Sequence, residues 1–101
     1  ERYKASIESF DNYILKFPGT KFREQAFFYK FESAYILAIN SIAILIPERI
    51  AEAQTYYEDY SKYYTGTELS KQAMIYAKDI DERTNTQTEL WIQISNTPTL
   101  Q

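Results

Sequence analysis

The sequence contains no cysteine and no histidine. Without cysteine there can be no disulfide bond, no thiolate zinc site and no cysteine nucleophile, and the redox compartment is left undetermined. Without histidine the chain lacks the usual general base, the commonest transition-metal ligand and the side chain that titrates near neutral pH. No nucleophile and base pair, phosphate-binding loop or metal-ligand set can be assembled from the other residues. We therefore expect a protein that is not an enzyme and that uses no cofactor and no metal.

Clustered positive charge and long apolar runs are also missing. The 11 Lys and Arg residues are interspersed with 14 Asp and Glu residues, for a net charge of -3. A nucleic-acid site would need Lys and Arg gathered on one face. The longest apolar stretch, residues 36–47, is interrupted by Asn40 and Ser41 and is shorter than the roughly 20 residues that a membrane-crossing helix needs. We expect neither a nucleic-acid partner nor a membrane-spanning segment.

Aromatic residues, in contrast, are abundant. They make up 17% of the 101 residues, and ten of them are tyrosines. Together with an apolar content of 45%, they can fill the core of one domain. Because a tyrosine buries its ring while its hydroxyl keeps a hydrogen bond, this composition suits a groove or a protein interface.

Residues 1–35 and 48–82 are two copies of one pattern. At an offset of 47 the copies share identical residues, which are Glu1/Glu48, Arg2/Arg49, Tyr13/Tyr60, Gly19/Gly66, Thr20/Thr67, Gln25/Gln72, Ala26/Ala73 and Tyr29/Tyr76. The only two glycines of the chain fall on equivalent positions. Self-similarity at a period of 20 to 50 residues is the signature of helical repeat arrays, in which each unit buries its apolar face against its neighbours. The chain is therefore predicted to be a helical repeat protein, an architecture that holds other proteins.

The first two helices are marked by turn residues between apolar stripes. A helix is expected over residues 1–17, because its stripe ends at Pro18 and Gly19. Thr20 is the expected N-cap of a second helix that reaches Asn40 or beyond. Alanines provide the close-packing positions of this second helix: Ala26, Ala34 and Ala38.

The third and fourth helices repeat this arrangement. Residues 41–46 fit a helix tail, a short strand or a buried loop by periodicity alone, and we favour a helix end followed by a turn. Pro47 suits the first turn of a third helix, where its missing N–H costs nothing, and that helix is expected to end near Tyr64. A fourth helix is expected to start near Glu68 and to last at least to Glu82.

The end of the chain is ambiguous. Residues 84–88 are expected to weaken the fourth helix, because Thr and Asn side chains offer the backbone competing hydrogen bonds. We divide the chain into a repeat domain, residues 1–83, and a C-terminal tail, residues 84–101, which can dock as a cap. Trp91 either covers the exposed end of the array or contacts a partner.

Four residues of the first copy form a pattern of small, aromatic, aromatic and proline: Ser6, Phe10, Tyr13 and Pro18. The second copy repeats the pattern: Ala53, Tyr57, Tyr60 and Thr65. This spacing resembles the second helix of the 34-residue tetratricopeptide repeat, although a threonine replaces the second proline and both tyrosines stand where a small residue is usual. The excess of roughly 13 residues over the standard period falls around residues 36–46, and a longer first helix explains it.

A longer match runs through the first copy. Residues 10–22 end in an aromatic-proline pair and a small polar turn, residues 24–26 are Glu-Gln-Ala, and a long helix carrying Ala34, Tyr35 and the Asn40-Ser41 pair follows. This order resembles the BamD-type lipoproteins of outer-membrane protein assembly, in particular their versions in Bacteroidetes. The resemblance covers roughly residues 1–83.

The resemblance implies an all-α fold of antiparallel helix hairpins, with about four main helices stacked in a short right-handed solenoid. It implies a noncatalytic scaffold at the periplasmic face of the outer membrane, which docks partner subunits during the assembly of β-barrel proteins. Since the chain begins at Glu1 without a methionine or a signal peptide, we expect a longer precursor whose lipid anchor and first repeats lie upstream. The alternative is another periplasmic tetratricopeptide module that binds an extended peptide in its concave groove.

By analogy with tetratricopeptide arrays, the first helix of each unit lines the concave surface. The binding residues predicted there are Phe22, Gln25, Tyr29 and Glu32 in one copy and Gln72, Tyr76 and Asp79 in the next. Their spacing puts amide, phenol and carboxylate groups on one helical face, where they can bind an extended peptide or a basic side chain. The alternative is that the tyrosines pack between units and that the polar groups are solvated.

Two further features have a structural and a functional interpretation. Five tyrosines lie in the nine residues 56–64, so Tyr56 and Tyr63 are candidates for exposed interface anchors, with core packing as the alternative. The acidic residues Asp79, Asp81 and Glu82 suggest a cation site only superficially, because they lack the glycine and the ligand spacing of a calcium loop. We interpret them as a solvated helix end.

Overall fold

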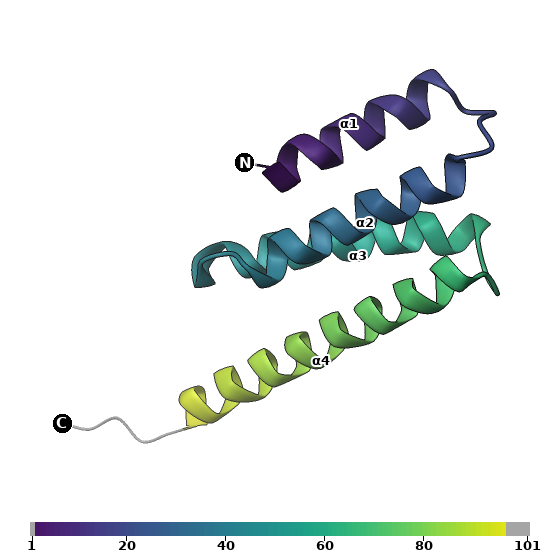
Figure 1. The fold of residues 1–101 in the computed structure, drawn as a ribbon. Helices are drawn as coiled ribbons and strands as arrows, with labels where there is room; N and C mark the ends of the chain where they lie inside the picture. Colours follow the sequence, from purple (N-terminus) through teal and green to yellow (C-terminus); the bar gives the residue numbers. More distant parts are fainter. Residues whose placement is uncertain (1, 97–101) are drawn as a thin grey trace.

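The protein is all-helical in the part that the structure, a computed structural model, describes: residues 2–96, without the side chains of residues 87–91 and 94–96. The elements are α1 (Arg2–Lys16), α2 (Arg23–Ile39), the short 3-10 helix η1 (Ala43–Leu45), α3 (Ile46–Tyr63) and α4 (Glu68–Asn96). Consecutive long helices run antiparallel, and the turns 17–22 and 64–67 lie at the same end (Figure 1). The prediction of four main helices in an all-α fold is confirmed.

Helix α2 lies at the centre of the structure. It packs against α1, α3 and α4, and α3 lies behind it in Figure 1. Seven of its residues are therefore buried, namely Ala26, Phe28, Phe31, Ser33, Ala34, Leu37 and Ala38. Helix α1, which packs mainly against α2, has no fully buried residue. A helix surrounded by three others, such as α2, needs apolar residues on all sides, whereas a helix with one main neighbour, such as α1, needs a single apolar stripe.

The core combines aromatic rings with alanines. Phe31 and Tyr60 are fully buried, and Ile80 of α4 is 1% exposed. The predicted close-packing alanines of α2 are buried, as are their counterparts Ala53 on α3 and Ala73 on α4. Because an alanine lets two helix backbones approach, the large rings of one helix fit between the small side chains of the next.

The helix ends follow the internal repeat closely but not completely. Helix α1 ends at Lys16 and α3 ends at Tyr63, which is the repeat offset of 47 residues (63 − 16). The starts of α2 and α4 do not keep this offset. Helix α2 starts at Arg23, so an exact repeat would start α4 at residue 70, but α4 starts two residues earlier, at Glu68. Gly66 has φ +76°, whereas Gly19 has no positive φ. The two turns therefore share their place in the repeat but not their backbone conformation.

The prediction of Thr20 as the N-cap of α2 is wrong. The N-cap is Phe22, and no side chain caps this end of the helix. The hydroxyl of Thr20 instead hydrogen-bonds to the hydroxyl of Tyr13 and accepts from the backbone N–H of Phe22. Thr20 therefore stabilises the turn before α2, and the helix begins only after that turn has closed.

The connection between α2 and α3 matches the favoured interpretation of a helix end and a turn. The chain leaves α2 at Asn40 and forms η1 before α3 begins, so residues 41–46 contain no strand. Pro47 lies in the first turn of α3, together with Glu48, whose charge complements the helix dipole. Arg49 also donates to the hydroxyl of Ser41 at 2.7 Å, which ties α3 to this turn.

Helix α4 continues through the proposed boundary after residue 83, and the predicted weakening at residues 84–88 does not interrupt it. The hydroxyl of Thr84 donates to the carbonyl oxygen of Ile80, one turn earlier, at 2.9 Å. Its hydrogen bond is thus made within the helix and does not compete with it. The side chain of Trp91 and residues 97–101 lie outside the described part. In that part, no helix combines the length and the apolar character that crossing a bilayer requires.

Candidate docking grooves

Two tyrosine–carboxylate pairs join α2 to α4. The hydroxyl of Tyr76 donates to Glu32 at 2.7 Å, and the hydroxyl of Tyr35 donates to Asp79 at 2.5 Å. The rings of Tyr35 and Tyr76 stack with their centroids 4.6 Å apart. Three of the predicted binding residues, Glu32, Tyr76 and Asp79, are therefore engaged inside the molecule, where they hold the two helices in register.

The two tyrosines of these pairs lose their protons only at high pH. Burial, with the hydrogen bonds to their carboxylate partners, raises the pKa of Tyr35 and of Tyr76 to about 12. The hydrogen bonds from Tyr35 and from Arg83 lower the pKa of the Asp79 carboxyl. At neutral pH the Tyr35 phenol is therefore a neutral donor to the charged Asp79 carboxylate, which is the stronger kind of hydrogen bond. Gln72, another predicted residue, is half-buried, and its side chain acts to lower the pKa of Tyr76 slightly against these effects.

A third carboxylate accepts hydrogen bonds at the end of the structure where the turns 17–22 and 64–67 lie. Glu24 of α2 accepts hydrogen bonds from the hydroxyls of Tyr60, at 2.7 Å, and Thr67. Burial raises the pKa of Tyr60 to about 12, and the bond to Glu24 adds to this effect. The equivalent hydroxyls of the first copy, those of Tyr13 and Thr20, bond directly to each other at 2.8 Å.

An apolar groove opens between α1 and α2 next to that turn. We call it the aromatic groove; it encloses about 320 Å³ and is lined by Ser9, Phe10, Tyr13, Phe22, Gln25, Ala26 and Tyr29. Phe22 is 50% exposed and Tyr29 is 41% exposed. The structure thus brings together three predicted binding residues, Phe22, Gln25 and Tyr29, with Phe10 and Tyr13 of α1, which the sequence analysis did not propose as binding residues.

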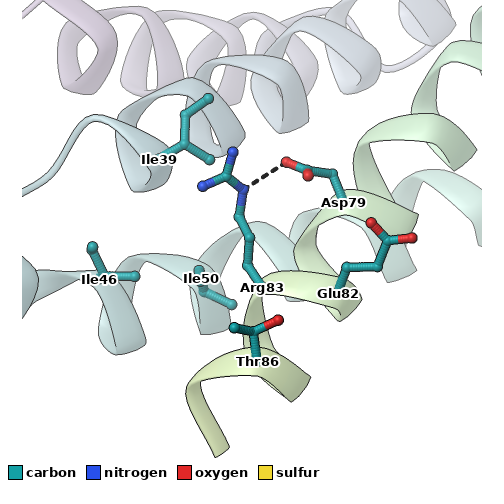
Figure 2. A pocket seen from close by; sticks show the side chains of 7 residues that line it. All are labelled: Ile39, Ile46, Ile50, Asp79, Glu82, Arg83 and Thr86. Carbon is teal, nitrogen blue, oxygen red and sulfur yellow. Dashed lines mark hydrogen bonds and ion pairs between the residues drawn. The ribbon is translucent and has the colours of Figure 1, made fainter. Parts of the chain in front are cut away.

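A second cleft lies at the opposite end, where α4 passes the connection between α2 and α3. It encloses about 420 Å³ and is lined by Ile39, Ile46, Ile50, Asp79, Glu82, Arg83 and Thr86. Figure 2 shows the side chain of Arg83 reaching from α4 toward Ile39, with its Nε donating to Asp79 at 2.7 Å. Only Asp79 of this set was predicted as a site residue. The spacing of Asp79 and Arg83, four residues apart on one helix, is the sequence pattern that could have indicated this ion pair.

The proposed interface aromatics occupy different environments. Tyr63 is 58% exposed, and the guanidinium of Arg23 lies over its ring at 4.7 Å. Tyr56 is half-buried, with the ammonium of Lys30 4.3 Å from its ring centroid. Tyr63 therefore presents an aromatic face at the surface, while Tyr56 is partly covered. The side chain of Trp91, the third proposed residue, is not among those described.

The grooves offer shape, aromatic surface and hydrogen bonds. In the described part of the chain no cluster of three or more acidic side chains is arranged to hold a metal ion. Glu24, Glu32 and Asp79 are held by hydroxyl or guanidinium donors, and Asp11 accepts from Lys30 at 2.8 Å. Comparison with protein-family models, with curated proteins and with solved structures found no match to this chain.

Proposed function

We propose that this protein is a noncatalytic scaffold that docks other proteins on its helical hairpins. The observation that carries the proposal is the aromatic groove, in which Phe22 and Tyr29 stay exposed beside the buried core of α2. Exposed aromatic side chains that line an apolar concavity are the usual anchors of protein interfaces. The phenol–carboxylate pairs between the helices serve the stability of the scaffold.

We further propose that the two hairpins are consecutive units of a tetratricopeptide-like, right-handed solenoid. Three observations support this arrangement: α1 and α3 end 47 residues apart, both short turns lie at one end of the structure, and a tyrosine and threonine pair recurs beside each turn. In such arrays each unit contacts only its neighbours, and the concave surface binds partners.

The biological role that we propose is the assembly of β-barrel proteins at the periplasmic face of the outer membrane, through docking of partner subunits. The support for this role is the resemblance of residues 1–83 to BamD-type lipoproteins. The aromatic groove gives such a partner a defined place to bind.

In-cell photocrosslinking of the full-length protein tests the proposal. A photoreactive phenylalanine analogue is placed at Tyr29, in the groove, and in a control at Ile44, which is 82% exposed on the α2–α3 connection. We expect subunits of the outer-membrane barrel-assembly machinery to be recovered from position 29 in excess over position 44. Recovery of no such subunit from either position contradicts the assembly role, and equal recovery from both contradicts the groove as the docking surface.

The second candidate function is binding of an extended peptide. It is favoured by the exposed amide of Gln25, which lines the otherwise apolar groove and can hydrogen-bond to a peptide backbone. Titration with a peptide library then gives saturable binding that is lost in both Gln25→Ala and Tyr29→Ala. Binding that survives both changes removes the groove as the peptide site.

A further inference from the structure

The connection between α2 and α3 exposes three consecutive apolar residues. Ile44 is 82% exposed, more than any other large hydrophobic residue of the described part, Ile42 is 68% exposed, and Ala43 between them is exposed as well. We call residues 42–44 the isoleucine tip. The tip lies at the end of the structure opposite the turns 17–22 and 64–67 (Figure 1). Because loops are normally polar, a run of exposed apolar residues in one of them indicates a contact with something outside the described chain.

The surroundings of the tip are uncharged, and their polar groups are already paired. Residues 33–47 contain no Asp, Glu, Lys or Arg. The side chains of Asn40 and Ser41 donate to carbonyl oxygens in the last turn of α2. The backbone N–H groups of Leu45 and Ile46 are satisfied by carbonyl oxygens of the tip itself. Transfer of the tip from water to a less polar medium therefore leaves few of these groups without a partner.

Further repeats on either side would not cover the tip. In a repeat array each unit packs against its neighbours through helix faces, whereas residues inserted into a unit lie in loops along one edge, which is often the binding edge. The tip lies within residues 36–46, around which the excess over the standard repeat period falls. A preceding or following unit would place its own connection beside the tip and leave the tip facing outward.

The composition of the tip fits a lipid surface better than a protein partner. The anchors of protein interfaces are mainly Trp, Tyr and Arg, held in well-packed pockets within a contact of about 800 Å² per partner. The tip is a short connection at the end of a hairpin, and its exposed side chains are two isoleucines and an alanine. A bilayer needs no complementary shape, and single aliphatic side chains can enter the boundary between its headgroups and acyl chains.

Cationic and aromatic side chains lie beside the tip, on the side of α1. A groove of about 490 Å³ there is lined in part by Arg2, Tyr3, Ile42 and Arg49, and no acidic side chain lines it among the described residues. The guanidinium of Arg2 lies 5.5 Å from the ring centroid of Tyr3. Guanidinium groups bind phosphates, and tyrosine rings are favoured at the headgroup level of a bilayer. The groove therefore matches lipid headgroups where the adjoining tip matches acyl chains.

We propose that the α2–α3 connection binds the surface of a phospholipid bilayer. The side chains of Ile42 and Ile44 enter the boundary between headgroups and acyl chains, and Arg2 and Arg49 contact lipid phosphates from the groove. Contact at this depth requires no helix that crosses the bilayer. The inference goes beyond the proposed docking function and does not depend on it, because the aromatic groove lies next to the turn 17–22, at the other end of the structure.

Flotation of the full chain with vesicles tests the contact. Vesicles of phosphatidylcholine mixed with phosphatidylglycerol are compared with vesicles of phosphatidylcholine alone. The variant combines Ile42→Ser and Ile44→Ser, and the matched control combines Leu15→Ser and Ile75→Ser, at positions that are 75% and 60% exposed on α1 and α4. We expect the variant to lower the partition coefficient roughly tenfold or more and the control to leave it unchanged. Arg2→Gln should weaken binding to the mixed vesicles more than binding to phosphatidylcholine.

A fluorescent probe shows which part of the surface enters the lipid. Because the chain contains no cysteine, an environment-sensitive fluorophore can be attached at one chosen position. On Ile44→Cys its emission should shift to the blue when mixed vesicles are added, whereas on Leu15→Cys it should not shift. Inorganic phosphate at the same phosphate concentration should leave both emissions unchanged, since an anion alone does not cover the tip.

Several results would overturn the proposal. Absence of binding to both kinds of vesicle does so, and so do equal probe shifts at positions 44 and 15, because the tip is then not the contact. A shift caused by inorganic phosphate alone would indicate an anion site in the groove. A dimer in sedimentation that Ile42→Ser with Ile44→Ser abolishes would make a second copy the occupant. If no vesicle binds and position 44 crosslinks to a protein in cells, the occupant is a partner protein, and the docking function stands while the lipid proposal fails.

Discussion

Three buried or half-buried tyrosines use their hydroxyls in the same way, each donating to a carboxylate of another helix. The pairs are Tyr35 with Asp79, Tyr60 with Glu24 and Tyr76 with Glu32. A phenol can bury its ring in the core and still leave one donor for a charged acceptor. The high tyrosine content therefore has a structural cause: these residues bring helix-joining hydrogen bonds into an apolar interior.

Removing one of these hydroxyls should cost stability without disturbing packing. In Tyr60→Phe the ring stays in place and the bond to Glu24 is lost, so we expect a loss of about 1 to 2 kcal/mol in the free energy of unfolding. Urea denaturation followed by circular dichroism measures the difference. Tyr63→Phe is the control, since Tyr63 is 58% exposed, and its change should stay within about 0.5 kcal/mol. Equal losses in both variants would argue against a role for the carboxylate.

The two equivalent glycines should respond differently to alanine. Gly66 has φ +76°, a region that alanine adopts at a cost of about 1 to 2 kcal/mol. Gly19 has no positive φ, and a Cβ there would meet no atom within 4 Å. We therefore expect Gly66→Ala to lower the urea midpoint and Gly19→Ala to leave it unchanged or to raise it slightly. A lower midpoint in both variants would mean that the two turns share one conformation in solution.

At the scale of the helices, the sequence predicted those ends that local chemistry determines. Pro18 and the second glycine terminate α1 and α3 close to the expected positions, and Pro47 starts α3. The start of α2 was predicted wrongly, although the hydroxyl of Thr20 accepts from the backbone N–H of Phe22, as an N-cap would. Residues 21 and 22 form a turn, and the helix begins only at Arg23. The same hydroxyl also bonds to Tyr13, seven residues earlier, a contact that a prediction from one segment does not include.

The candidate site was predictable in part for a related reason. The recurrence of Gln, Tyr and an acidic residue marked one face of α2 and one face of α4 as candidate binding surfaces. Of the residues on these faces, Phe22, Gln25 and Tyr29 line the aromatic groove. Periodicity could not show that Glu32 and Asp79 would each pair with a tyrosine across the interface. Each pair is separated by 44 residues, and its formation depends on the relative shift of two helices, which only their packing determines.

Because Tyr35, Tyr60 and Tyr76 join helices through their hydroxyls, we expect the protein to lose stability at high pH. The pKa values of Tyr35, Tyr60 and Tyr76 are raised to about 12 in the folded protein, against about 10 in the unfolded chain. The folded state holds these protons more tightly, so their stabilisation is complete below pH 10 and is lost as the pH rises from 10 to 12. Linkage makes the free energy of unfolding fall with pH in this window, most for the fully buried Tyr60.

The free energy of unfolding, measured by urea titration at several pH values, tests this expectation. A variant with all three tyrosines changed to Phe should be less stable at neutral pH and should show a flatter decline between pH 10 and 12. Tyr29→Phe serves as the control, because Tyr29 is 41% exposed and its hydroxyl joins no helices in the described structure. An identical slope in the triple variant and the parent protein would contradict the role of these phenols.

For the molecule as a whole, burial is concentrated on α2 and decreases toward α1. Helix α2 contributes most of the buried core, whereas α1 is held by half-buried apolar side chains and by the ion pair of Asp11 with Lys30, 2.8 Å apart. Local opening costs least where few apolar side chains are fully buried. The helix that forms one wall of the aromatic groove therefore has no fully buried side chain that holds it to the core, which lowers the free energy of its local opening.

Native-state hydrogen exchange should therefore show graded protection. We expect the backbone amides of α2 to exchange only through global unfolding, and those of α1 to exchange through a local opening of lower free energy. Ile7 packs against the core from α1, so Ile7→Ala should speed exchange in α1 while protection in α4 falls only by the change in global stability. A docked partner should slow exchange in α1 more than in α4, because it adds buried contacts on the groove side. Equal protection of α1 and α2 in the free protein would mean that the hairpins unfold as one unit, and a partner would then have to bind a groove that is already rigid.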